Sequence, residues 1–192
     1  MIENRKITIE GAVPLIMHNG RTANPLDPYT KQLKAITGKR KKTDADYEAM
    51  AQVEWKAGLY LNDADKVIMP SVNIEACIIG GAKKSKLGKI FQGGMMVYDD
   101  AIFIHEGGSL KQLENDSRFW DTRAVKIGQN KIMRTRPIFN VWSMSFIVGY
   151  ETEVLDKAQL IQAIEDAGRL VALGDYRPRY GRFNLTGDEN AD

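Results

Sequence analysis

The sequence lacks several features that mark common classes of protein. It has one cysteine, Cys77, so no internal disulfide can form and a reducing, cytoplasmic location is expected. Its two histidines, His18 and His105, lie far apart along the chain, which argues against a Cys/His metal site. No run approaches the roughly 18 apolar residues of a membrane span, and the first residues, MIENRKITIEG, contain no apolar signal region. We therefore expect a soluble protein with no cofactor, no metal and no membrane partner.

Net charge is also small, but the charges are unevenly distributed. The net charge of +2 does not by itself indicate a nucleic-acid partner. Between Pro28 and Thr43, however, every charged residue is basic. Acidic residues gather instead at 44–54, 99–121 and 151–166. Such segregation can give a nearly neutral protein one basic face.

Length and composition predict a single domain. The chain has 192 residues, of which 43% are hydrophobic and 27% are charged, as in ordinary globular proteins with one core. The last residues are polar and acidic, and chain ends of this kind are often poorly ordered. We expect one domain over residues 1–185, followed by a flexible acidic tail over 186–192.

The N-terminal part of the chain shows one strand pattern and one helix start. Polar and apolar residues alternate from Lys6 to Met17, which predicts one long, interrupted strand ending near His18. The residues that follow are rich in turn formers. Thr43 precedes several acids, an arrangement typical of a helix N-terminus, and that helix should end at Gly58.

The middle of the chain predicts a strand, a helix and two further strands. The segment Val67–Ser71 has a short apolar strand at its start and a helix N-cap at its serine. From Ile74 to Gly81 the apolar and small residues recur at i, i+3, i+4 and i+7, which places them on one face of a helix. Short apolar runs at 95–98 and 101–104 predict strands.

The C-terminal part completes the predicted fold. Trp142–Tyr150 alternates strictly and predicts the clearest strand in the chain. Asp156 begins the last helix in a capping-box pattern, Gly174 ends it, and 179–185 predicts the last strand. The order of elements is βαββαβ, so we expect an α+β fold with a ferredoxin-like, RRM-like core and a large insertion at about 18–66.

The segment Leu173–Phe183 has the most informative composition. Glycine lets backbone approach a ligand closely, arginine binds phosphate through a planar fork, and aromatic rings can stack on bases. An ordinary helix, turn and edge strand with a basic face is the alternative. We expect Gly174 at a helix C-cap with positive φ, and Gly181 where the backbone passes close to a phosphate or a neighbouring subunit. The candidate nucleic-acid-binding residues in this segment are Tyr176, Arg177, Arg179 and Arg182.

Other basic clusters are further candidates for phosphate contact. One follows the predicted helix that ends near Gly81, and one lies in the predicted loop after Gly38. Solvated side chains at a helix end or in a loop are the alternative explanation for both. The candidates in these clusters, with one arginine near His18, are Arg21, Lys39, Arg40, Lys41, Lys42, Lys83, Lys84 and Lys86.

Two of these segments resemble a known family. Val67–Ile78 looks like the strand, proline and helix-start motif of the RAMP superfamily, the RRM-like proteins of CRISPR effectors. Gly174–Phe183 is similar to the glycine-rich loop near the C-terminus of those proteins. The subunits that form the helical backbone of the effector are the most similar members, and the resemblance favours a stand-alone RAMP-like protein of phage or mobile-element origin.

The resemblance implies a specific arrangement of the chain. It implies a palm with an RRM-like sheet, a thumb-like β-hairpin at about 122–140, and side-by-side assembly of copies along single-stranded nucleic acid. The bases on that hairpin are expected to be exposed and to touch phosphates without distinguishing sequence. They are Lys126, Lys131, Arg134 and Arg136.

The expected function is therefore non-catalytic binding of single-stranded RNA or DNA, with little sequence dependence, by a homo-oligomer. Two alternatives remain open. His18 could act as the base of a metal-independent endoribonuclease, and Asp27 could resemble the loop aspartate of target-cleaving backbone subunits. The chain could also be a decoy or adaptor that binds a CRISPR-type complex. Trp142, Phe146 and Tyr150 share one strand face and are expected to pack in the core instead of stacking on bases.

Overall fold

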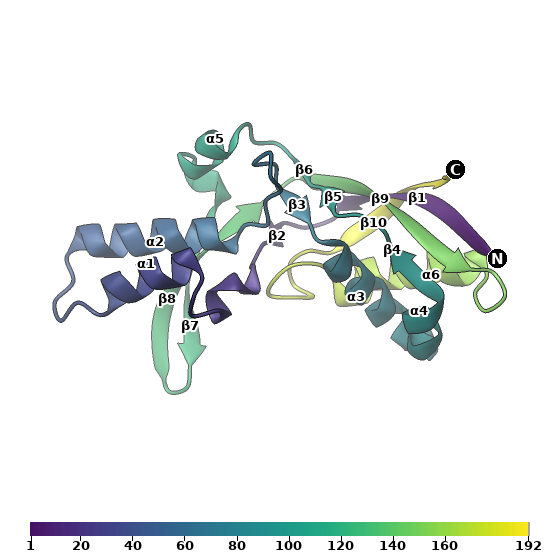
Figure 1. Ribbon diagram of the computed structural model, residues 1–192, viewed down its shortest axis with the longest axis horizontal. Helices are drawn as coiled ribbons and strands as arrows, with labels where there is room; N and C mark the ends of the chain where they lie inside the picture. Colours follow the sequence, from purple (N-terminus) through teal and green to yellow (C-terminus); the bar gives the residue numbers. More distant parts are fainter. Residues whose placement is uncertain (192) are drawn as a thin grey trace. The chain divides into compact units, whose positions relative to one another are not determined.

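The computed structural model describes residues 1–191, which form two compact units. The first unit contains residues 1–15, 61–106 and those from 140 onward, and the second contains 16–60 and 107–139. The chain thus passes from one unit to the other several times (Figure 1). The elements of the first unit are β1 (Ile2–Gly11), β3 (Ile68–Met69), α3 (Ser71–Ala82), η2 (Lys83–Ser85), α4 (Gly88–Gly94), β4 (Met95–Val97), β5 (Ala101–Ile102), β6 (Ile104–His105), β9 (Trp142–Glu151), α6 (Lys157–Asp166), the π-helical turn η4 (Ala167–Val171) and β10 (Phe183–Asn190).

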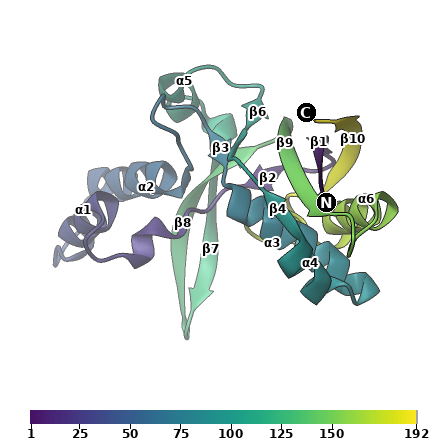
Figure 2. The same cartoon turned by 45° about the vertical axis from the view of Figure 1, so that its right-hand side comes forward.

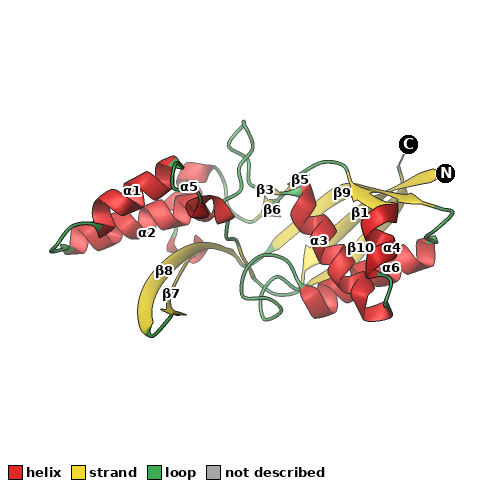
Figure 3. Ribbon diagram, turned by 60° about the horizontal axis from the view of Figure 1, so that its bottom comes forward, coloured by secondary structure: helices red, strands yellow, loops and turns green. Residues whose placement is uncertain are grey.

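The first unit is an antiparallel sheet with helices on one face. Its strand order is β10-β1-β9-β4, and β6 also pairs with β9. Along the chain the elements β1, α3, β4, β9, α6 and β10 follow one another as βαββαβ. Helices α3 and α6 lie together beside the sheet (Figure 3). The α+β class expected from the sequence is confirmed.

The alternating sequence of β9 explains the core of this unit. The side chains of Trp142, Phe146 and Tyr150 are all buried, as predicted, because every second residue of a strand points to the same face. Leu160 and Ile164 of α6 are also buried. Burying one such side chain stabilises the fold by about 1.5–3 kcal/mol.

A glycine permits the close packing of α3 on α6. A Cβ added at Gly81 would lie 2.1 Å from the backbone oxygen of Ala163. The predicted small-residue position on the apolar stripe of α3 is therefore a helix–helix contact point.

The second unit combines helices with a long hairpin. Helix α2 begins after Thr43, as predicted, and this N-cap residue forms a capping box with Asp46. Trp55 of α2 is buried, donates its Nε1–H to the backbone oxygen of Phe119 at 2.8 Å, and stacks on Trp120 with ring centroids 5.5 Å apart. The elements of this unit are η1 (Gly20–Ala23), α1 (Pro28–Thr37), α2 (Asp44–Gly58), α5 (Leu110–Glu114), η3 (Ser117–Phe119), β7 (Trp120–Ile127) and β8 (Asn130–Phe139).

The predicted β-hairpin is present as β7 and β8. The two strands pair antiparallel from Trp120↔Pro137 to Ile127↔Asn130, and the turn contains Gly128 at φ +59° (Figure 2). Glycine adopts this left-handed conformation without the cost that other residues pay. The hairpin lies near the range 122–140 that the sequence suggested.

Two local predictions were wrong in the N-terminal and middle parts, and one helix was missed. The first strand does not continue to His18: β1 ends at Gly11, and a separate strand, β2 (Leu15–Ile16), joins the sheet of order β2-β8-β7. Helix α1 was not predicted from the sequence, and only Thr30 of its ten residues is buried. The N-cap of α3 is Pro70, and the backbone N–H of Ser71 donates to Asp100.

Most of the predicted flexible tail over 186–192 forms a strand, and residue 192 lies outside the described residues. Strand β10 continues to Asn190, and its pairing with β1 runs from Phe183↔Gly11 to Asn190↔Arg5. Arg5 holds the end of this strand, because its guanidinium donates to Asp188 and Asn190. A buried arginine with paired acceptors can order a segment whose composition alone suggests a loose end.

Candidate nucleic-acid interface

A pocket in the first unit brings together two of the predicted binding segments. It is an open depression between the C-terminal end of α3, the turn η4 and the loop that precedes β10, with a volume of about 660 Å³. Lys83 and Lys84 come from the first segment, and Tyr176 and Arg177 from the second. We call this the basic pocket, and its lining residues are Gly80, Lys83, Lys84, Leu170, Val171, Gly174, Asp175, Tyr176, Arg177 and Pro178.

The end of α3 positions the lysines of the basic pocket. The helix stops at Ala82 and continues into the short turn η2, which Lys86 closes in the left-handed conformation at φ 62°. The backbone N–H of Leu87 then donates to the oxygen of Ala82 at 2.9 Å. Lys83 and Lys84 are exposed on this turn, so their ammonium groups are available to an anion in solution. Lys86 is exposed as well but does not line the pocket.

The loop that forms the other wall is closed at its base by the backbone. The N–H of Leu173 donates to the oxygen of Gly181 at 3.0 Å, and the N–H of Gly181 donates to Pro14 at 2.8 Å. Gly181 has φ +74°, and a Cβ there would lie 1.8 Å from the oxygen of Leu173. The close approach at Gly181 in this structure is to the backbone of the chain itself. Gly174 has the predicted positive φ of 77°, but the residue that caps the last helical turn is Ala172.

Tyr176 and Arg177 differ in exposure at the rim of the basic pocket. Tyr176 is half-buried, and its ring meets that of Tyr180 edge-on at 6.5 Å between centroids. Arg177 is exposed, yet its charge reaches the buried thiol of Cys77. Burial raises the pKa of Cys77 to about 12, and the guanidinium of Arg177 opposes that rise. The pocket thus offers one aromatic ring and three cationic side chains to a ligand.

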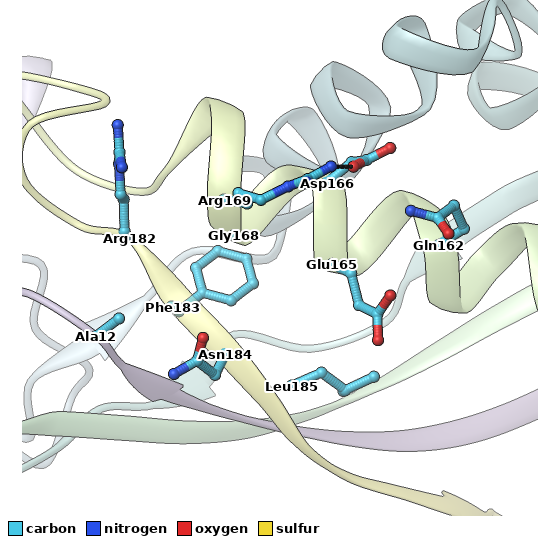
Figure 4. Close-up of a pocket in the computed structure, with 10 residues that line it drawn as sticks. All are labelled: Ala12, Gln162, Glu165, Asp166, Gly168, Arg169, Arg182, Phe183, Asn184 and Leu185. Atoms are coloured by element: carbon cyan, nitrogen blue, oxygen red, sulfur yellow. Dashed lines mark hydrogen bonds and ion pairs between the residues drawn. The ribbon is translucent and has the colours of Figure 1, made fainter.

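Arg179 and Arg182 do not line the basic pocket. Arg179 is exposed on the same loop, and the Nε–H of Arg182 donates to the backbone oxygen of Pro178 at 2.8 Å. Arg182 lines a second cavity of about 480 Å³ between α6, η4 and β10 (Figure 4). Glu165 and Asp166 also line that cavity, and Asp166 pairs with Arg169 at 2.7 Å. Its mixed charge makes it a poorer anion site than the basic pocket.

The predicted basic loop of the second unit is partly engaged by its own acids. Lys39 pairs with Asp46 at 2.6 Å, and the Nζ of Lys42 donates to the backbone oxygen of Lys39 at 3.1 Å. The hydrogen bond from Lys39 lowers the pKa of Asp46 to about 2. Arg40 and Lys41 are exposed between α1 and α2. These two are the best placed bases of the loop to contact a phosphate.

The hairpin separates its four predicted bases into two groups. Lys126 and Lys131 face each other across the ladder near the turn, and both are exposed. Arg134 pairs with Glu54 of α2, and the same carboxylate accepts the backbone N–H of Thr135 at 2.9 Å.

Arg136 lies deeper on the hairpin, opposite Asp121. Two of its guanidinium nitrogens are buried. Arg134 and Arg136 are thus half-buried and not the fully exposed bases that the sequence predicted, and Arg134 is held by an acid 80 residues away.

The predicted residues around His18 have structural partners. Arg21 pairs with Asp27 at 3.0 Å and lies over the ring of Tyr29 at 4.8 Å. Asp27 is buried and caps α1, since its carboxylate accepts the N–H of Tyr29 at 2.9 Å. Burial opposes ionisation of Asp27, but the hydrogen bond from Arg21 and those from the backbone lower its pKa overall. His18 is exposed, and its backbone oxygen accepts the hydroxyl of Tyr60 at 3.2 Å.

Within residues 1–191 the structure contains no cluster of three metal-binding side chains. Over the same residues, every helix is too short or too polar to cross a membrane.

Asp175 lines the basic pocket but was not predicted from the sequence, because an isolated acid beside a tyrosine forms no recognisable pattern.

Comparison with known proteins gives a likeness in fold only. No protein-family model matches the chain, and no curated protein matches it. Its structure is similar to a chain in the cryo-EM structure of the Type III-B Cmr-beta bound to cognate target RNA, with a TM-score of 0.58 and 10% sequence identity over 98% of this chain. This chain spans 60% of that Cmr-beta chain. The crystal structure of Cmr6 from Pyrococcus furiosus matches with a TM-score of 0.39 and 11% identity, over 97% of this chain and 99% of that one. The chain, with its antiparallel βαββαβ unit, therefore shares the fold of that Cmr-beta chain.

Proposed function

We propose that this protein binds single-stranded nucleic acid without cleaving it, and that the basic pocket is a principal contact site. The observation that carries the proposal is the meeting of Lys83 and Lys84 with Tyr176 and Arg177 in one pocket. The lysines and the arginine supply phosphate contacts, and the tyrosine ring supplies a face for a base. The likeness in fold to a chain in a complex with target RNA supports the proposal.

The second unit supplies further phosphate contacts in this proposal. Arg40 and Lys41 stand exposed between two helices, and Lys126 and Lys131 stand exposed near the hairpin turn. Contacts of this kind hold the sugar–phosphate backbone and do not distinguish one base from another. We expect binding with little sequence preference and a strong dependence on salt.

We further propose that several copies bind side by side along a long strand. The basic pocket by itself, at about 660 Å³, has the size of a small-molecule site, so it holds only a short piece of the strand and a long strand has room for further copies. Light scattering with a short and a long oligonucleotide tests this. Complexes whose mass grows with strand length support it, and one copy per strand at every length contradicts it.

The test of binding compares two variants of equal charge change. Lys83→Ala combined with Lys84→Ala removes two cations from the basic pocket, whereas Lys6→Ala combined with Lys66→Ala removes two exposed cations elsewhere in the same unit. Fluorescence anisotropy with a labelled single strand gives Kd at several salt concentrations. Removing one lysine–phosphate contact should reduce the slope of log K against log[salt] by roughly 0.7.

The pocket variant loses one or two phosphate contacts, so the slope of log K against log[salt] should become shallower by roughly 0.7 to 1.4. The control variant should keep a slope near the wild-type value. If both double variants had the same salt slope, the basic pocket would not be part of the nucleic-acid interface. Intact oligonucleotide after long incubation without metal supports a non-catalytic role, and a discrete cleavage product would contradict it.

A further inference from the structure

A groove lies along the free edge of the sheet in the first unit. It is the cavity of about 480 Å³ that α6 and η4 line from one side and the start of β10 lines from the other (Figure 4). We call it the edge groove, because β10 ends the strand order β10-β1-β9-β4 and no strand of residues 1–191 pairs with its outer side. The edge groove and the basic pocket share no lining residue.

The register of β10 leaves backbone groups free on its outer side. In an antiparallel pair, successive residues alternate between bonding the neighbouring strand and facing away from it. The N–H of Ala12 donates to the oxygen of Arg182 at 2.8 Å, so Arg182 faces the chain of β1. By alternation Phe183 and Leu185 face away, and the oxygen of Phe183 lies against Gly168, where an added Cβ would be 2.2 Å from it. The N–H and C=O of Leu185 are therefore the first groups along β10 with which a further strand can pair.

The edge groove also contains one carboxylate that the protein leaves unmatched. Asp166 pairs with Arg169 at 2.7 Å, and the Nε–H of Arg182 donates to the backbone oxygen of Pro178 at 2.8 Å. Glu165 is exposed, and within residues 1–191 its carboxylate has no ion pair and no hydrogen bond. Figure 4 shows its side chain projecting from α6 toward β10. A negative charge without a partner thus stands beside the free edge of a strand.

These two features specify the chemistry of an occupant. The N–H and C=O groups of a strand edge pair with an extended polypeptide, which presents the same groups in alternation. A carboxylate forms its strongest contacts with the cation of a lysine or an arginine. We propose that the edge groove binds an extended segment of a partner protein, which adds to β10 as a further strand and places a basic side chain against Glu165. The added strand is short, because the register of β10 shifts between Leu185 and Gly187.

Selection from a phage library of random octapeptides on the immobilised wild-type protein tests the proposal. Counter-selection on Glu165→Gln removes peptides that do not need the carboxylate. The enriched peptides should carry a lysine or an arginine at one fixed position. A library without enriched peptides, or enriched peptides without a basic residue, would overturn the proposal.

Two matched variants test the role of the carboxylate. Glu165→Gln removes its charge, and Glu48→Gln makes the same change at an exposed glutamate of α2 in the second unit. The Kd of the most enriched peptide, labelled with fluorescein and measured by anisotropy, should rise roughly two- to fivefold for Glu165→Gln and stay unchanged for Glu48→Gln. A peptide with glutamine in place of its basic residue should bind the wild type and Glu165→Gln equally. If Glu165→Gln binds the original peptide as tightly as the wild type does, the proposed contact is wrong.

N-methylation of alternate amides of the peptide tests the strand pairing. Of the two alternating patterns, one removes the donors that face β10 and should raise Kd about tenfold or more, whereas the other should change Kd little. Hydrogen exchange of the Leu185 amide should slow when the peptide binds. Equal Kd values for both patterns, or an unchanged exchange rate, would contradict strand addition at this edge. Dimers of the protein that the peptide dissociates would make a second copy the occupant and would also contradict the proposal.

Discussion

Gly181→Ala is the substitution whose effect follows most directly from the structure. The new Cβ would lie 1.8 Å from the backbone oxygen of Leu173, 2.8 Å from its carbon and 3.1 Å from its nitrogen. All three neighbours are backbone atoms, so a side-chain rotation cannot relieve the contact. The φ of +74° adds the strain that any residue with a Cβ has in the left-handed region.

The expected loss of stability is the sum of two effects. The left-handed conformation costs an alanine about 1–2 kcal/mol. Forcing an extra carbon into a packed site costs about 1–3 kcal/mol more. For a protein of this size each kcal/mol lowers Tm by roughly 2–4 °C, so Tm should fall by at least about 4 °C.

Thermal unfolding followed by circular dichroism measures this effect, with Gly93→Ala as the control. A Cβ at Gly93 has no neighbour within 4 Å, and Gly93 lies in α4, where alanine favours the helix. The control should therefore keep or slightly raise Tm. An unchanged Tm for Gly181→Ala would refute the closed base of the loop, and with it the geometry of the basic pocket.

Three other predictions follow from paired or buried groups. Because burial raises the pKa of Cys77 to about 12, its thiol should resist alkylation by iodoacetamide in the native protein and react after denaturation, and fast native labelling would contradict this. Glu54→Ala leaves Arg134 and a backbone N–H of the hairpin without their acceptor, so urea unfolding should show a loss of about 1–3 kcal/mol, and no loss would mean that this contact is weak. Lys39 lowers the pKa of Asp46 to about 2, so the stability from this pair is present above its ordinary pKa of 3.8 and is lost as pH falls toward 2. Asp46→Asn should reduce the dependence of the urea midpoint on pH in that window, and an unaltered dependence would contradict the pairing.

Much of the first unit was predictable because its patterns are local. The alternation over Trp142–Tyr150 places its large side chains on one face of a strand, and the structure buries them. In the second unit, the acids after Thr43 predicted the start of α2, and the capping box is present. Helix α1 escaped prediction because its residues are mostly exposed, although Asp27 and Pro28 together are a recognisable N-terminal pattern.

The ion pairs and the end of the chain were not predictable from local sequence. Nothing near Arg134 indicates that Glu54, 80 residues earlier, holds its guanidinium. The acidic composition of the chain end is typical of a loose tail, but Asp188 accepts a hydrogen bond from Arg5 near the opposite end of the sequence. Such ion pairs depend on how the chain folds, because the fold brings together residues that lie far apart in the sequence.

The basic pocket could be predicted only in part. Lys83, Lys84 and Arg177 were each predicted as phosphate contacts from their own segments. Their meeting in one pocket depends on how α3 packs against α6 and on how the loop closes at Gly181.

The most direct test of the account is photo-cross-linking of the wild-type protein to a single-stranded RNA that carries 4-thiouridine. Mass spectrometry of the digested complex identifies the peptide that is joined to the RNA. The account predicts a cross-link in the loop of the basic pocket, at or next to Tyr176, that disappears with Lys83→Ala combined with Lys84→Ala. Cross-links confined to other segments, or a yield that the double variant leaves unchanged, would contradict the central claim that this pocket binds nucleic acid.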